Sequence, residues 1–424
     1  MSRDGIETFG ARHVHNKPVG SERRTVDARI FSAETTAAAM AEISTWPGYA
    51  PTPLVKLQGL ANVLGLAKIF YKDESRRFDL MSFKALGGAY AVLGVVRSHL
   101  KSRGIETIST RKLLDGAHRD LAREITVATA TDGNHGRSVA WGAQMFGARC
   151  KIYLHAHVSK DREAEIAKYG AEILRIDGGY DDSVRQCAAD AARNGWILVA
   201  DTNSGGGDPA MPALIMQGYT VMVEELTVQF PDPHATHIFV QGGVGGIAAA
   251  VAAHLTNRYG TQRPRIIVVE PMQADCIFRS IAAGRPTAIA GDVETFMACL
   301  AAGEISPLAW PYLKSGVDDV IALPEAAAPA AMRLLANGAG GDPPLVSGES
   351  GCAAIAGLIE AASDPELRSA IGLTDQSVVI AIGSEGATDA STYRLVVGRT
   401  ADEVWADAAA RTKTAAKPPP RSSR

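Results

Sequence analysis

The segment Ser82-Phe83-Lys84-Ala85-Leu86-Gly87-Gly88 places one lysine between an aromatic residue and a run of small residues that opens a predicted helix. The pKa of an unperturbed lysine is about 10.4, so its amine is protonated near neutral pH. Desolvation lowers that pKa, and the neutral amine can then attack a carbonyl. We therefore expect Lys84 to be a Schiff-base nucleophile. The alternative is a lysine that extends from a helix start into solvent.

A second loop with chemical potential, Thr131-Asp132-Gly133-Asn134-His135-Gly136, follows an apolar stretch and opens another predicted helix. Glycine lets the backbone approach a ligand closely, and the first turn of a helix offers free N–H groups that suit a carboxylate. The amide of Asn134 adds a donor for an oxygen atom. The pattern indicates an anion-binding loop; the alternative is a turn with ordinary helix capping.

A third loop, Gln241-Gly242-Gly243-Val244-Gly245-Gly246, again lies between an apolar stretch and a helix of small residues. Successive glycine amides at a helix N-terminus form a cradle for a phosphate. The loop lacks the lysine of a P-loop and is a weak match to the dinucleotide-binding pattern. Glu270, at the end of the next predicted strand, would be the acid that binds a ribose hydroxyl, so a nicotinamide enzyme stays open.

Two further loops carry polar residues. Ser384 follows the apolar stretch 378–382, and a hydroxyl at the carboxyl end of a strand lies where open α/β sheets bind ligands. Glu349 lies in Gly348-Glu349-Ser350-Gly351, before another predicted helix. Each of these loops alone is compatible with an ordinary turn.

Together these residues are the groups needed to hold pyridoxal phosphate. Lys84 would bind its aldehyde, Asn134 its ring 3-oxygen and Ser384 its ring nitrogen. The phosphate would lie against the glycine loop, which consists of Gly242, Gly243, Val244, Gly245 and Gly246. This order resembles the fold-type II, or tryptophan synthase β-like, family of pyridoxal-phosphate enzymes. A hydroxyl at the ring nitrogen does not enforce a protonated pyridine, which suits β-elimination or replacement.

Within that family the resemblance narrows to the diaminopropionate ammonia-lyases and covers about residues 31–400. The matching segments are Phe31-Ser32, Pro47-Gly48-Tyr49, Thr52-Pro53-Leu54, Lys72-Asp73-Glu74-Ser75-Arg76-Arg77-Phe78, Phe83–Ala91, Thr131–Arg137, Gly179-Tyr180-Asp181-Asp182, Ile215-Met216-Gln217-Gly218-Tyr219 and Gly348–Gly351. The resemblance implies α,β-elimination of D- or L-2,3-diaminopropionate to pyruvate and ammonia. Serine and threonine dehydratases resemble the chain more loosely.

The resemblance also implies roles for two aspartates. One acid takes the α-proton of the D-isomer and the other that of the L-isomer, and they correspond to Asp132 and Asp201. The stretch 202–208 after Asp201 departs from the family pattern. The residues expected to contact the substrate are Ser82, Thr131, Asp132, Gly133, His135 and Glu349. No metal is expected. A family disulfide near the entrance would join Cys276 to Cys299, although reduced thiols are the simpler expectation.

Alternating apolar runs and helical patterns predict an α/β fold with two open parallel-type sheets flanked by helices. The predicted strands are 68–72, 125–130, 149–155, 172–176, 196–200, 237–241, 265–270, 319–323 and 378–382. The predicted helices are 84–100, 135–146, 160–169, 181–193, 214–228, 246–259, 324–337 and 351–362. We expect an N-terminal extension (1–30), a large cofactor-binding domain (31–85 and 202–410), a small inserted domain (86–201) and a disordered tail (411–424).

Composition is that of an ordinary globular protein. The 424 residues are 46% hydrophobic and 21% charged, and the formal net charge is −3, so nothing favours a nucleic-acid or membrane partner. The five cysteines form no C-x-x-C pair, and the charged first thirty residues lack the apolar segment of a signal peptide. We expect a cytoplasmic enzyme that acts on a small amino acid and, by resemblance, forms a homodimer.

Two other classes of enzyme remain open. A β-replacing transferase of the cysteine synthase type would use the same cofactor groups but would consume a second nucleophile. A nicotinamide oxidoreductase would use only the glycine loop and would leave Lys84 unexplained.

Overall fold

The structure is a computed structural model that describes residues 6–17, 30–131, 133–202, 208–230, 235–291 and 293–415, with side chains as far as 411. Asp132 and most of the stretch 202–208 therefore lie outside the described residues. Among the described helices, none combines the length and apolar character needed to cross a membrane.

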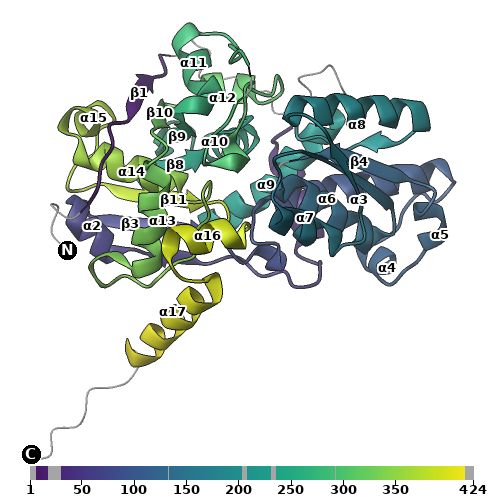
Figure 1. The fold of residues 1–424 in the computed structure, drawn as a ribbon, viewed down its shortest axis with the longest axis horizontal. Helices are drawn as coiled ribbons and strands as arrows, with labels where there is room; N and C mark the ends of the chain where they lie inside the picture. Colours follow the sequence, from purple (N-terminus) through teal and green to yellow (C-terminus); the bar gives the residue numbers. More distant parts are fainter. Residues whose placement is uncertain are drawn as a thin grey trace, which may run out of the picture.

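Two sheets form the centre of the molecule (Figure 1). The larger has the order β1-β10-β9-β8-β11-β3-β2, and the smaller has the order β6-β5-β4-β7. The strands of the larger sheet are β1 (Arg12–His15), β2 (Leu54–Lys56), β3 (Lys68–Asp73), β8 (His237–Gln241), β9 (Arg265–Pro271), β10 (Asp319–Leu323) and β11 (Val378–Gly383). Those of the smaller sheet are β4 (Thr126–Ala130), β5 (Arg149–His155), β6 (Glu172–Ile176) and β7 (Ile197–Leu198).

The predicted α/β class with two parallel-type sheets is confirmed. Every pairing in the smaller sheet is parallel, and the larger sheet is parallel from β10 to β3. The prediction missed the two edge strands of the larger sheet, β1 and β2, which pair antiparallel with β10 and β3. Both are short and only partly buried, so neither shows the continuous apolar run that marks a central parallel strand.

All eight predicted helices are present; the one at 246–259 has the predicted bounds, and the other seven have shifted ends. Helices pack around both sheets. They are α1 (Ala33–Ile43), α2 (Gln58–Leu64), α3 (Lys84–Ser102), α4 (Thr110–Leu114), α5 (Arg119–Ala122), α6 (Asn134–Phe146), α7 (Lys160–Ala167), α8 (Tyr180–Asn194), α9 (Ala210–Gln229), α10 (Gly246–Tyr259), α11 (Cys276–Ala283), α12 (Trp310–Gly316), α13 (Ala327–Asn337), α14 (Ala353–Ser363), α15 (Pro365–Ala370), α16 (Ala390–Val397) and α17 (Ala401–Ala415). The segment 411–415, expected to belong to the tail, is the end of α17.

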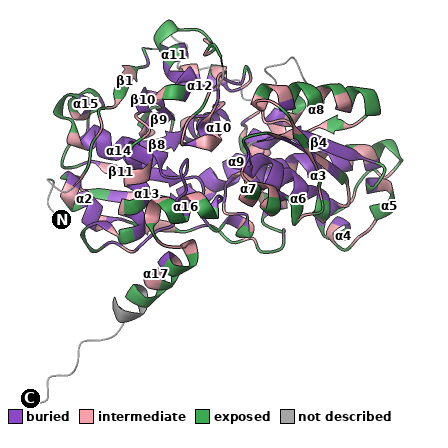
Figure 2. Ribbon diagram, viewed as in Figure 1, coloured by how far each residue is buried: buried purple, intermediate pink, exposed green. Residues whose placement is uncertain are grey.

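The larger sheet is covered on both faces. Ile238 and Val240 of β8 pack into one hydrophobic cluster, whereas Phe239 between them packs into another. Successive strand residues point to opposite faces, so this alternation shows apolar cover on both sides. Figure 2 shows the same result as buried central strands beneath more exposed helices. The first cluster continues through Val127 and Ile152 into the smaller sheet, so the two sheets share packing.

Helices α3 and α9 approach each other closely because glycines face one another. A Cβ atom on Gly218 would lie 2.3 Å from the carbonyl oxygen of Leu86. A Cβ on Gly87 would lie 2.5 Å from Cε1 of Tyr219. Real Cβ atoms do not approach other atoms so closely, so both positions require glycine for the helices to cross at this distance. The crossing brings α9 against the first turn of α3, where Lys84 lies.

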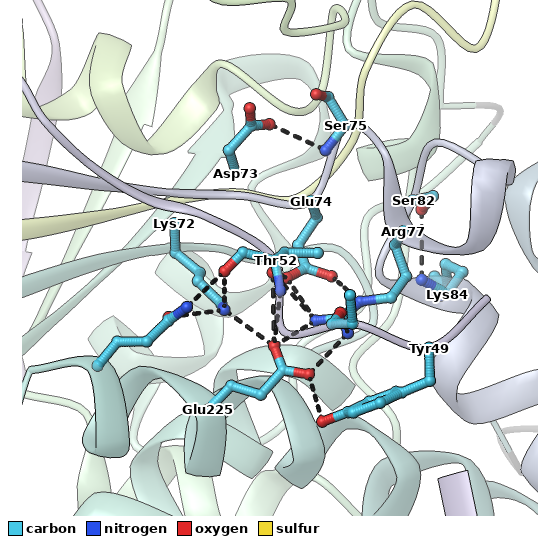
Figure 3. Close-up of polar contacts among 12 residues, drawn as sticks. Tyr49, Thr52, Lys72, Asp73, Glu74, Ser75, Arg77, Ser82, Lys84 and Glu225 are labelled. Carbon is cyan, nitrogen blue, oxygen red and sulfur yellow. Dashed lines mark hydrogen bonds and ion pairs between the residues drawn. The ribbon is translucent and has the colours of Figure 1, made fainter. Parts of the chain in front are cut away.

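A buried ionic network anchors the chain between β3 and α3 (Figure 3). Arg77, 1% exposed, donates from Nε to Glu74 Oε2 at 2.8 Å and from Nη2 to Glu225 Oε2 at 2.7 Å. Lys72 donates from Nζ to the same Glu225 oxygen at 2.9 Å, and the Tyr49 hydroxyl donates to Glu225 Oε1 at 3.0 Å. Buried charges are costly unless they are paired and hydrogen-bonded, and here each has several partners.

The network holds a strained turn in place. Phe78, Asp79 and Met81 adopt φ values of 52°, 58° and 55° in the left-handed region. Bulky residues rarely adopt this conformation, which costs on the order of 1–3 kcal/mol at each position and persists only where surrounding contacts impose it. The turn joins Arg77 to the start of α3, so the ionic network determines where Lys84 enters the molecule.

We predict that Arg77→Leu lowers the free energy of unfolding by about 3–5 kcal/mol, because it leaves buried carboxylates without their main partner. Arg111→Leu is the control: its ion pair with Asp115 is exposed, with 86% and 67% of the two side chains accessible, and we expect a loss below about 1 kcal/mol. Urea unfolding of both variants measures the difference. Equal losses would contradict the role given to the network.

Candidate active site

The loops predicted from sequence meet around one cavity of about 1270 Å³ between the two sheets. Its wall includes Phe83, Lys84, Asn134, Asp201, Tyr219, Gly242, Gly243, Val244, Gly246, Cys299 and Ser384. Lys84 and Ser384 are adjacent, because the amide of Phe83 donates to the carbonyl oxygen of Ser384 at 3.0 Å. Segments separated by three hundred residues therefore form one site.

Lys84 is paired with Asp201. Its Nζ donates to Oδ2 of Asp201 at 2.6 Å, and 17% and 18% of the two side chains remain accessible. Lys84 is the first residue of α3, and Asp201 lies after β7, at the edge of the smaller sheet where the strands have their carboxyl ends. The structure thus brings together two residues that the sequence predicts to be catalytic.

The protonation state of Lys84 differs from the expectation. Burial, the largest single effect, lowers the pKa of Lys84 as expected, but the charge and hydrogen bond of Asp201, together with Tyr219 and Cys299, hold the pKa above its ordinary value. The prediction of a lowered pKa is therefore wrong for this arrangement. Burial raises the pKa of Asp201, yet Lys84, with His135, holds it below its ordinary range. Lys84 must pass a proton to become a nucleophile, and Asp201 is in contact to receive it.

Asn134 is the first residue of α6 and lies 7% exposed at the cavity wall. Its Nδ2 donates to Cys299 Sγ at 3.4 Å and to the carboxylate of Glu385, while its Oδ1 accepts from Arg137 at 3.0 Å. The bond from Arg137 fixes the orientation of the amide, so its N–H₂ group points to the cavity side. A donor held in this way suits an oxygen on a bound ring.

The glycine loop has the form of a phosphate cradle. Gly243 and Gly245 adopt φ values of 65° and 93°, which favour glycine. A Cβ on Gly242 would lie 2.5 Å from Cγ of Glu270, and one on Gly245 would lie 2.6 Å from Leu313 Cδ1. The loop ends at Gly246, where the free N–H groups of the first turn of α10 favour an anion. The residues present therefore fit the phosphate of pyridoxal phosphate.

Glu270 does not have the role that a nicotinamide enzyme would require. It is fully buried behind the glycine loop and accepts the amides of Ile277 and Phe278 at 3.1 and 2.8 Å. Burial raises the pKa of Glu270 to about 8, against the lowering by these hydrogen bonds. The carboxyl group caps α11 instead of facing a ribose.

The other predicted contacts near Lys84 hold the backbone. Thr131 accepts the amides of Gly133 and Gly136 at 3.0 and 3.1 Å. The ring of His135 contacts the carbonyl oxygen of Val199 at 2.7 Å. Burial lowers the pKa of His135, so the ring is neutral near neutral pH. These bonds shape the loop on which Asn134 lies; contact of these side chains with substrate stays a prediction.

Ser82 also interacts with the backbone. Its hydroxyl accepts the amide of Lys84 at 3.3 Å, as Figure 3 shows. It is buried, and its backbone pairs with that of Glu385. Ser82 thereby fixes the first turn of α3.

Glu349 pairs with an arginine from the opposite side of the cavity. Arg162 of α7 forms an ion pair with Glu349 and lies 3.9 Å from a carboxylate oxygen of Asp389. Nearby, the Ser391 hydroxyl donates to Asp161 at 2.6 Å. Burial raises the pKa of Glu349 to about 7, although Arg162 lowers it. These contacts join α7, on the smaller sheet, to the segments beside the larger sheet.

The sequence interpretation missed several residues of the site. Arg162 and Glu385 are charged, buried and in contact with predicted site residues. Glu385 follows Ser384 directly and Arg162 lies in the predicted helix 160–169, but no local pattern shows that either charge faces inward. The two cysteines considered for a disulfide, Cys276 and Cys299, are not joined by one in the structure.

We predict that Asp201→Asn lowers the pKa of Lys84, because burial then acts without the opposing carboxylate. Each unit by which the pKa falls raises the fraction of neutral amine about tenfold. The rate at which acetic anhydride acetylates Lys84 at pH 8, followed by peptide mass spectrometry, should therefore rise. Asp190→Asn, which removes an acid bonded to Tyr153, should leave the rate unchanged. A slower reaction in Asp201→Asn would contradict the ion pair as the cause.

Comparisons with known proteins agree with this geometry. The family model described as "Pyridoxal-phosphate dependent enzyme" matches residues 45–383. The diaminopropionate ammonia-lyase of Escherichia coli (strain K12) is 40% identical over 357 residues, which cover 82% of this chain and 88% of the relative. That of Salmonella typhimurium (strain LT2) is 36% identical over 366 residues, with 84% and 90% covered.

Solved structures give the same result. The holo Escherichia coli diaminopropionate ammonia-lyase superposes with a TM-score of 0.83 at 36% identity and covers 93% of this chain and 98% of that one. The same enzyme in complex with D-serine has the same TM-score and coverage at 35% identity. The chain belongs to the pyridoxal-phosphate dependent enzymes of fold-type II and, within them, to the diaminopropionate ammonia-lyase family.

Proposed function

We propose that this enzyme releases ammonia from 2,3-diaminopropionate by α,β-elimination and forms pyruvate and a second ammonia. The observation that carries the proposal is the Lys84–Asp201 pair in a cavity that also presents a phosphate cradle and the Asn134 amide. The relatives described above act on diaminopropionate by name, and they match most of the chain. An acid in direct contact with the lysine supplies the proton acceptor that an elimination needs.

Each group has a proposed task. Bound pyridoxal phosphate withdraws electrons from the α-carbon of an amino acid and so makes its α-proton removable. Lys84 holds the cofactor covalently between turnovers and exchanges a proton at Nζ. Asp201 accepts that proton or the α-proton of the L-isomer, and Asp132 takes the α-proton from the other side of the substrate. The glycine loop binds the phosphate, Asn134 the ring oxygen and Ser384 the ring nitrogen.

We also propose that the segment 86–201 closes on the substrate as a unit. The contacts from Arg162 to Glu349 and from Ser391 to Asp161 span the two sides of the cavity and would hold the closed form. Closure would exclude water from a reactive product until it is released. Glu349 would then hold the closed form and need not contact substrate.

We further propose a cytoplasmic homodimer. The few cysteines, none of them in a disulfide, suit a reducing compartment, and the family resemblance suggests the dimer. Light scattering of the purified chain measures the assembly directly.

The rival functions differ in their products. A β-replacing transferase would need a second nucleophile and would release little pyruvate. A serine or threonine dehydratase would prefer a hydroxyl as the leaving group over an amine. The position of Glu270 beneath the glycine loop removes the support for a nicotinamide enzyme.

We predict that the enzyme releases pyruvate from D- or L-diaminopropionate faster than from D-serine or L-serine, and that L-threonine is the poorest source of a keto acid. Lys84→Ala should lose this activity and the yellow colour that borohydride discharges. Lys160→Ala, which removes an exposed lysine of α7, should keep both. Absence of pyruvate from both diaminopropionate isomers would overturn the proposal.

We predict opposite isomer preferences for the two aspartate variants. Asp132→Asn should reduce kcat/KM for the D-isomer more than for the L-isomer, and Asp201→Asn should do the reverse. Loss of a general base typically costs about 10²–10⁴-fold, so the ratio of the two isomers should change by at least about tenfold. If each variant loses both isomers equally, the aspartates position the site instead of choosing a face.

A further inference from the structure

Tyr219 lines the cavity beside Lys84, and the proposed function gives it no role. It belongs to α9, is 1% exposed and lines the cavity. Its ring centre lies 5.8 Å from Nζ of Lys84 and 4.7 Å from the ring centre of Phe83. The position of the Tyr219 ring depends on two glycines, which leave room for it. The ring lies against Gly87 on one side, and a Cβ on Gly246 would lie 3.6 Å from its Cε2.

The hydroxyl of Tyr219 is buried and lies outside regular hydrogen-bond geometry to the described residues, although its interaction with the amine of Lys84 lowers its pKa. Buried phenols usually find a hydrogen-bond partner. Those of Tyr49, Tyr71 and Tyr153 do, at 3.0, 2.8 and 2.6 Å. Tyr219 lies close enough to Lys84 and Asp201 for each to perturb its pKa. A buried donor without a regular hydrogen bond beside the reactive lysine therefore requires an explanation.

We propose that the Tyr219 hydroxyl donates a hydrogen bond to the neutral amine of Lys84 and so positions it to capture the aldehyde of pyridoxal phosphate. Protonated Lys84 has a partner, because the ammonium donates to Asp201. Once Asp201 has taken the proton, its acid can donate to the amine but can also return the proton, whereas a phenol can donate a hydrogen bond to the nitrogen and keep its own proton. A phenol can donate or accept, so Tyr219 can partner Lys84 in both of its protonation states.

The proton balance of the capture step agrees with this assignment. The ammonium of Lys84 carries three protons. One passes to Asp201 before attack, and the other two leave with the aldehyde oxygen as water when the carbon–nitrogen double bond forms. Tyr219 keeps its own proton throughout. Burial raises the pKa of Tyr219 to about 12, despite the lowering by Lys84, so the phenol remains a donor near neutral pH.

The charged and titratable groups that face Lys84 come from four elements. They are Asp201 after β7, Tyr219 on α9, Cys299 beside the glycine loop and, through Asp201, His135 on α6. The acid form of Asp201 competes with the amine for the proton that it holds, and the neutral ring of His135 contacts Val199. Removal of the Tyr219 hydroxyl should therefore destabilise the neutral amine more than the ammonium, which keeps Asp201.

The test measures covalent capture of pyridoxal phosphate by the full chain stripped of cofactor, trapped with borohydride and quantified at Lys84 by mass spectrometry between pH 6 and 10. Tyr219→Phe keeps the ring and its packing. We expect capture at pH 7.5 to slow by at least about tenfold and the pH profile to shift to higher pH. Tyr393→Phe is the matched control: it also removes a buried hydroxyl without a regular hydrogen bond, but outside the cavity wall, and it should behave as the parent.

Two results would overturn the proposal. One is an unchanged rate and profile in Tyr219→Phe. The other is an equal slowing at every pH, which would mean that the hydroxyl serves packing alone. Capture does not involve an amino-acid substrate, so this result is independent of whether diaminopropionate is the true substrate. The inference rests only on the cofactor part of the proposed function.

Discussion

The buried charge of Arg77 is the constraint on which the arrangement of the site depends. A guanidinium cannot lose its proton in a protein, so burying it requires carboxylates that stay in place. Glu74 supplies one from the end of β3, and Glu225 supplies the other from α9. The network therefore joins the strand that precedes the lysine to the helix that carries Tyr219. It also holds the strained turn that includes Met81, and this turn fixes the position at which α3 begins.

The Lys84–Asp201 pair follows the same electrostatics but has a different outcome. Both pairs are desolvated, and in both an opposite charge offsets the cost of burial. Arg77 keeps its charge permanently, which suits an anchor, whereas a lysine can pass its proton to the carboxylate beside it. The raised pKa of Lys84 is therefore a property of a resting pair. Reactivity depends on how well the site supports the neutral amine after the proton has moved.

Much of this molecule could be predicted from sequence, because its main signals are local. The central strands are continuous apolar runs, and the ligand loops follow their carboxyl ends, as parallel sheets require. The contact between Arg162 and Glu349 could not be predicted, since their separation of 187 residues is closed only by packing of the two sheets. The role of Glu270 could not be predicted either. Its position at the end of a strand suggested a ribose ligand, but in the fold its carboxylate accepts hydrogen bonds from α11.

The small residues after Lys84 have a packing role in the structure that differs from their interpretation in the sequence. As a sequence, Gly87-Gly88 indicates a helix that opens beside a ligand. In the structure, Gly87 faces α9, and a Cβ on Gly88 would lie 2.6 Å from Oγ of Ser138 on α6. Glycine is costly inside a helix, at roughly 1 kcal/mol relative to alanine, so two in succession need a compensating contact. That contact is the close packing of α9 and α6 against the first turn of α3. The glycines therefore have a packing role in this structure. They admit the helices that bring Tyr219 and the Asn134 loop to the lysine, and for this reason the motif and the site occur together.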